Sequence, residues 1–231
     1  MNNIDKFTKL FLEFEVETKK KIKDKDLKLW QCIEILKDNG CNPYYDNYNF
    51  IEFCRKLRNI NSHNITDNYY SISDETLRKL GEIVDEVKHP AKVEEKATHP
   101  VYSKNLNDKV LSTMQEMNKE VYTHIPIYSE DNTKLIGVFS ENSLFQYIME
   151  NKEIDIDSNT TFKDIKKCID THKHGDIVRF VDKDKLYDDV VNDFIEEFTK
   201  GNKLSCVMVT DSSQTTEPVV GIITAWDIIG R

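Results

Sequence analysis

Apolar positions along this 231-residue chain follow two different patterns. Up to about residue 88 they recur every three to four residues, which is the spacing of one face of an α-helix. Four such stripes predict four helices, and the simplest architecture for residues 1–88 is a four-helix bundle. The stripes are Ile4, Phe7, Phe11 and Phe14; Leu29, Trp30, Ile33 and Leu36; Phe50, Phe53, Cys54 and Leu57; and Leu77, Leu80, Val84 and Val87.

Beyond His89-Pro90, amphipathic stretches alternate with short apolar runs, and one order of elements occurs twice. In each copy an amphipathic stretch leads to two apolar runs joined by a polar turn, and the second run contains a glycine and closes on Ser or Thr. The copies occupy residues 107–120, 124–128 and 135–140, and residues 187–200, 206–210 and 219–224. Duplication of one supersecondary unit predicts two stacked modules with a cleft between them.

The second copy ends in a specific string, a hydrophobic residue before Gly221, then two hydrophobic residues, Thr224, two further residues and Asp227. Together with the duplicated elements, this string resembles tandem cystathionine-β-synthase (CBS) domains, small βαββα modules that pair into a pseudo-two-fold disc. The resemblance implies an α+β fold, with a helical bundle over residues 1–88 and a CBS pair over residues 89–231. The modules would lie at about 97–150 and 176–231.

The resemblance also implies a site for an adenosine-containing small molecule. In that family the residue at the position of Thr224 contacts phosphate or ribose, and the one at Asp227 accepts hydrogen bonds from both ribose hydroxyls. The residue types suit this chemistry, because free N–H groups at a helix start attract phosphate and a carboxylate can bind a vicinal diol. The alternative for Asp227 is a carboxylate that stabilises the first turn of the terminal helix.

Alignment to the family places Ser205 and Cys206 near the base, and Arg179 or Lys203 within reach of a phosphate. The alternative for Arg179 is a solvated surface charge. The expected ligands are AMP, ADP or ATP, with S-adenosylmethionine as the alternative, and no metal is expected.

The first copy differs at one position. Ser140 matches Thr224, but Ser143 stands where the second copy has Asp227. A charge-assisted hydrogen bond contributes roughly 1.5–3 kcal/mol against about 1 kcal/mol for a neutral one, so we expect one good nucleotide site rather than two. The alternative is that Ser140 caps a helix and Ser143 is a surface position.

One string in the helical region resembles a catalytic motif. Arg58-Asn59 followed by His63 resembles the Arg-Asn-x-x-x-His signature of the HEPN family, helical bundles of which many are metal-independent ribonucleases. The resemblance implies that His63 acts on the 2′-hydroxyl of RNA, that Arg58 steadies the phosphate, and that two chains in a homodimer build the site. A neutral imidazole and a guanidinium suit those roles. The alternative is that Arg58 and His63 hold a helix end and a dimer contact.

Composition and charge limit which partners, location and cysteine chemistry we expect for this protein. Most of the net charge of −9 falls in residues 89–231, so a polyanion such as DNA would find no long-range attraction there. A basic cluster at residues 19–28 indicates a solvated helix end, with an RNA-contacting patch as the alternative. No apolar run reaches the ~20 residues of a membrane span and the start lacks a signal-peptide pattern, so we expect a cytoplasmic protein without a membrane partner. Five cysteines without C-x-x-C spacing suggest neither disulfides nor zinc.

Two hypotheses of function follow. In the first, the chain is an adenine-nucleotide sensor whose helical domain dimerises or docks a partner. In the second, the tandem module regulates a HEPN-type ribonuclease. A tandem with a purely structural role is a third reading.

Overall fold

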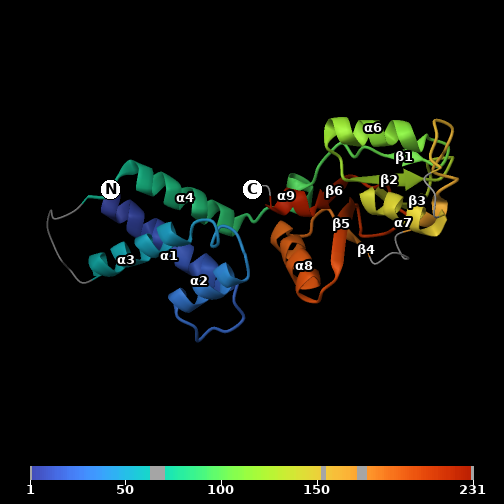
Figure 1. The fold of residues 1–231 in the computed structure, drawn as a ribbon. Coiled ribbons are helices and arrows are strands. Elements are labelled where there is room, and N and C mark those ends of the chain that lie inside the picture. Colours follow the sequence, from blue (N-terminus) through green and yellow to red (C-terminus); the bar gives the residue numbers. More distant parts are fainter. Residues whose placement is uncertain (1, 63–70, 152–154, 171–175, 230–231) are drawn as a thin grey trace. The chain divides into compact units, whose positions relative to one another are not determined.

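The structure is a computed structural model that describes residues 2–62, 71–151, 155–170 and 176–229. It divides into two compact units, residues 1–91 and 92–231 (Figure 1). The helical character of the first region and the mixed α/β character of the second are as the sequence predicts.

The first unit contains the helices α1 (Asn3–Lys20), α2 (Leu29–Asp38), α3 (Tyr48–Ser62) and α4 (Asp74–Lys88). Helix α1 contacts the other three, and its phenylalanines Phe7, Phe11 and Phe14 are buried in the shared core. Trp30 and Phe53, expected in the buried stripes, are instead each 48% exposed. Each is next in sequence to a stripe residue and is therefore turned about 100° away from the core face.

The second unit contains two three-stranded sheets with the same order of elements. The first sheet joins β1 (Lys104–Asn105), β2 (His124–Tyr128) and β3 (Leu135–Ser140); the second joins β4 (Asp176–Asp182), β5 (Lys203–Thr210) and β6 (Gly221–Thr224). In each sheet the first pair of strands is parallel and the second antiparallel. The helices are α6 (Val110–Glu120), α7 (Glu141–Asn151), α8 (Tyr187–Thr199) and α9 (Ala225–Ile229), which makes each module βαββα (Figure 1).

Each module is completed by the segment that precedes the other module in the sequence. The segment around α5 (Val93–Lys96) precedes the first module, yet Thr98 exchanges two backbone hydrogen bonds with Ile222 in β6 of the second. The segment around the short 3₁₀ helix Lys166–Cys168 precedes the second module, yet the Ile169 carbonyl accepts from Val138 N in β3 at 2.9 Å. The two modules are therefore connected in both directions.

The glycine in the last strand of each copy has a steric reason. A Cβ at Gly137 would lie 2.0 Å from the Ile169 carbonyl oxygen, and a Cβ at Gly221 would lie 2.8 Å from the Ala97 Cβ. Each glycine thus lets a crossing segment approach the strand closely.

The modules also share a core. Val138 of the first module packs with Cys206, Met208 and Ile222 of the second, and the Tyr128 hydroxyl accepts a hydrogen bond from Val219 N at 3.1 Å. The pseudo-two-fold disc expected from the resemblance stays a prediction.

Candidate ligand-binding site

A cavity of about 700 Å³ lies between the two modules of the second unit. The first module contributes the start of β2, the end of β3 and the first residues of α7. The second contributes the last turns of α8, the start of β5 and the junction of β6 with α9. The ends of equivalent strands therefore meet at this cavity, as expected for a cleft between duplicated modules.

Four residues with hydroxyl groups line the cavity, namely Thr123, Ser140, Ser205 and Thr224. Ser205 differs from the others, because it is only 6% exposed and its Oγ has no hydrogen-bond partner among the described residues. A buried hydroxyl without a partner costs about 1–3 kcal/mol. Among the residues that line this cavity, Ser205 is therefore the one whose hydroxyl would be stabilised most by a hydrogen bond to a ligand.

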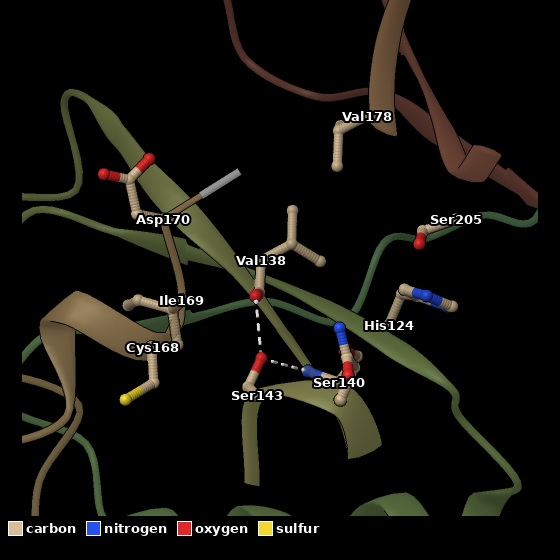
Figure 2. A pocket seen from close by; sticks show the side chains of 10 residues that line it. His124, Val138, Ser140, Ser143, Cys168, Ile169, Asp170, Val178 and Ser205 are labelled. Carbon is tan, nitrogen blue, oxygen red and sulfur yellow. Dashed lines mark hydrogen bonds between the residues drawn. The ribbon is translucent and has the colours of Figure 1, made fainter. Parts of the chain in front are cut away.

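A smaller cavity of about 30 Å³ adjoins this serine. In the view of Figure 2, Val178 lies above this smaller cavity, Ser205 and His124 at the right, and Ser140 and Ser143 below. The volume of this smaller cavity is about that of one water molecule. Ser205 thus lines both a ligand-sized and a water-sized space.

The second module supplies an apolar wall to the large cavity. Phe194, Ile195 and Phe198 come from α8, and Trp226 and Ile229 from α9. Phe198 is 82% and Trp226 70% exposed, although both are large and apolar. Aromatic side chains beside a cavity offer faces on which a flat ring can stack.

The half-buried Asp227 points toward the residues before α9 rather than into this wall. Its Oδ2 accepts from the Thr224 backbone N at 2.6 Å and from the Thr224 hydroxyl at 2.8 Å, and its Oδ1 accepts from the Thr98 hydroxyl at 3.3 Å. Thr224 lines the cavity, and Asp227 is not among its lining residues. In this structure Asp227 caps the start of α9, the alternative that the sequence left open.

Ser143 performs the same capping in the first module. Its Oγ accepts from Ser140 N at 3.1 Å and donates to the Val138 carbonyl at 3.3 Å (Figure 2). Ser143 is 4% exposed, so the reading of this residue as a surface position is wrong.

The other two residues aligned to the family's pocket lie away from the cavity. Arg179 in β4 forms ion pairs with Asp193 at 2.7 Å and Glu197 at 2.8 Å, both in α8. A hydrogen bond from Asn202, assisted by Arg179, lowers the pKa of Glu197. Cys206 is fully buried in the core between the modules.

The HEPN-like string is only partly described. Arg58 and Asn59 lie on the exposed face of α3 near its end, and Arg58 is 3.9 Å from Glu15 of α1. His63 lies outside the described residues. The ribonuclease site and the homodimer therefore stay predictions, and loss of RNA cleavage in His63→Ala would test the former.

Sequence reasoning missed the apolar wall. Phe194 and Phe198 fall within the amphipathic stretch 187–200, and Trp226 is one of the two unspecified residues between Thr224 and Asp227. The signal in the sequence that indicated this wall was the density of large apolar residues in the short terminal segment, which exceeds what one helix face can bury.

Among the described residues no helix is long and apolar enough to span a membrane.

A family model for the CBS domain matches residues 93–150, so the chain contains a CBS domain there. No curated protein matches the chain. Among solved structures, the CBS domain pair of protein MJ0100 in complex with 5′-methylthioadenosine and S-adenosyl-L-methionine is 21% identical, with a TM-score of 0.43, 61% of this chain covered and 94% of that one.

Two further structures match the same share of the chain. An uncharacterized conserved protein from Pyrococcus horikoshii is 11% identical over 61% of this chain and 91% of that one, with a TM-score of 0.44. The conserved CBS domain protein TA0289 of Thermoplasma acidophilum, of unknown function, is 19% identical over 61% and 68%, with a TM-score of 0.42.

Proposed function

We propose that residues 92–231 bind one adenosine-containing small molecule in the 700 Å³ cavity, and that the helical unit transmits the bound state to a partner. The observation that carries the proposal is the Ser205 hydroxyl, buried at the cavity and without a partner among the described residues. A ligand that hydrogen-bonds this group removes the cost of its burial.

The cavity suits such a ligand in size and in the distribution of its polar groups. Ligand cavities usually measure about 300–1,000 Å³ and combine apolar walls with a few polar groups. The apolar wall from α8 and α9 offers faces to a purine, and the hydroxyls of Thr123, Ser140 and Ser205 offer partners to a ribose. These two kinds of lining match the two halves of adenosine.

A single ligand per chain is expected. The large cavity is asymmetric, because the second module contributes the apolar wall and the partnerless serine, while the first contributes mainly polar residues at its strand ends. The position equivalent to Asp227 in the first module is the buried Ser143, which already hydrogen-bonds to two backbone groups.

Regulation follows from the place of the cavity between the modules. A ligand that contacts both modules favours one arrangement of them over another by its difference in affinity for the two. Hydrogen exchange of residues 1–91, measured in the full chain with and without ligand, would test whether the helical unit responds. Unchanged exchange there would contradict transmission through this unit.

The test of binding is calorimetric titration of the full chain with AMP, ADP, ATP and S-adenosylmethionine. We expect about one ligand per chain for at least one of them, and an affinity roughly five- to tenfold lower in Ser205→Ala, because one hydrogen bond contributes about 1 kcal/mol. Ser112→Ala, which removes an exposed hydroxyl of α6, is the matched control. Absence of binding by all four ligands, or equal affinity in both variants, would contradict the proposal.

A further inference from the structure

The charges of the residues that line the large cavity nearly cancel one another. Among the described residues that line it, Lys203 is the one lysine or arginine and Glu141 the one aspartate or glutamate. Both are exposed. Apart from His124, the side chains of the lining therefore carry no net charge, whereas AMP carries about two negative charges and ATP about four.

One backbone N–H at the start of each of the two helices beside the cavity is already engaged. Phosphate sites often use the free N–H groups at the start of a helix. Here the N–H of Thr224, before α9, donates to Asp227 at 2.6 Å, and the N–H of Ser140, before α7, donates to Ser143 at 3.1 Å. Each module thus caps its own helix start at the cavity.

The carboxylate of Glu141 would repel a phosphate group bound in the cavity. It is the first residue of α7 and lines the cavity at the end of the helix where an anion would otherwise be favoured. Its carboxylate stabilises the helix but disfavours a second negative charge beside it. The two strand ends therefore combine hydroxyl-bearing residues with one engaged N–H each, and the carboxylate of Glu141 at one of them disfavours a phosphate.

We infer that the cavity selects adenosine ligands without phosphate, meaning the nucleoside or 5′-substituted derivatives that are neutral or cationic, over adenine nucleotides. This inference rests on the proposed function and narrows its ligand class. Discrimination comes from the cancelling charges, the two engaged N–H groups and Glu141. A ribose and a purine still find the Ser205 hydroxyl and the apolar wall.

The test compares ligands that differ in phosphate content. The full chain is titrated by calorimetry, at one ionic strength, with adenosine, S-adenosylmethionine, AMP and ATP. Adenosine and AMP form the matched pair, because they differ by a single phosphate. We expect AMP to bind at least tenfold more weakly than adenosine, and ATP more weakly still.

Two variants identify the origin of the discrimination. Glu141→Gln should strengthen AMP binding about threefold or more and leave adenosine binding unchanged. The control is Glu95→Gln, which removes the same charge from an exposed position of α5 outside the cavity lining and should change neither affinity.

The outcomes separate this inference from the proposed function. AMP or ATP binding as tightly as adenosine would overturn the inference and leave the proposed function standing. Equal effects of Glu141→Gln and Glu95→Gln on AMP would overturn the role of Glu141. No binding of any of the four ligands would overturn both the inference and the function on which it rests.

Discussion

Two buried serines of the second unit should respond in opposite ways to the same substitution. Ser205 and Ser143 are 6% and 4% exposed, but Ser143 makes two hydrogen bonds whereas the Oγ of Ser205 has no partner among the described residues. Ser143→Ala loses both bonds, at about 1 kcal/mol each, so its free energy of unfolding should fall by about 2 kcal/mol. Ser205→Ala removes a poorly satisfied hydroxyl, so its free energy should stay constant or rise by up to about 1 kcal/mol.

The expected difference between the variants is therefore about 2–3 kcal/mol. Urea unfolding of the ligand-free full chain, followed by circular dichroism, measures it as a shift in midpoint at constant slope. The same proteins are then titrated with ligand. Ser205→Ala should combine undiminished stability with weakened binding, which is the signature of a group placed for a ligand rather than for the fold.

A fall in the stability of Ser205→Ala as large as that of Ser143→Ala would refute this reasoning. It would mean that the Ser205 hydroxyl has a partner within the ligand-free protein. A water molecule bound in the adjoining 30 Å³ cavity would be one such partner.

Three further predictions concern the surrounding structure. Gly137→Ala should lower the free energy of unfolding by about 2–3 kcal/mol in urea titrations, because its Cβ meets the Ile169 carbonyl, whereas Gly81→Ala in α4 meets nothing and should raise it by about 0.5–1 kcal/mol. Asp227→Ala should cost about 1–2 kcal/mol by the same measurement, because it uncaps α9. The lowered pKa of Glu197 means stability that is present above its ordinary value of 4.5 and lost as pH falls through the lowered value, so thermal unfolding measured from pH 6 to pH 3 should show a smaller loss in Glu197→Gln. Equal stability of both glycine variants, an unchanged Asp227→Ala, or identical pH profiles would contradict the respective predictions.

The elements were largely predictable from the sequence because their apolar periods are strong. The strands His124–Tyr128 and Leu135–Ser140 and the four N-terminal helices follow directly from spacing. The crossing segments were not predictable in this way, since they have little regular secondary structure and bond to residues far along the chain, as Thr98 does to Ile222. In the sequence, these segments are marked by the glycine in the last strand of each module. The steric reason for that glycine becomes visible in the packing.

A cavity between the modules was predictable from the duplication, whereas the expected ligand contacts stay predictions. The strand ends at Ser140 and Thr224 meet at the cavity as the duplication suggested. The expected contact of Asp227 with ribose stays a prediction; in this structure its carboxylate accepts from the backbone N–H of Thr224. Spacing along a sequence does not distinguish a cap from a ligand contact, because both need an acceptor one turn into a helix.

The measurement that tests the central claim most directly uses the position of the two tryptophans. Trp226 lines the cavity and Trp30 lies in the helical unit, so in Trp30→Phe the fluorescence of the single remaining tryptophan reports on the cavity. Titration of this variant with adenosine should change the emission of Trp226 and saturate at about one ligand per chain. Binding detected by calorimetry without any change in Trp226 emission would place the ligand elsewhere and contradict the account.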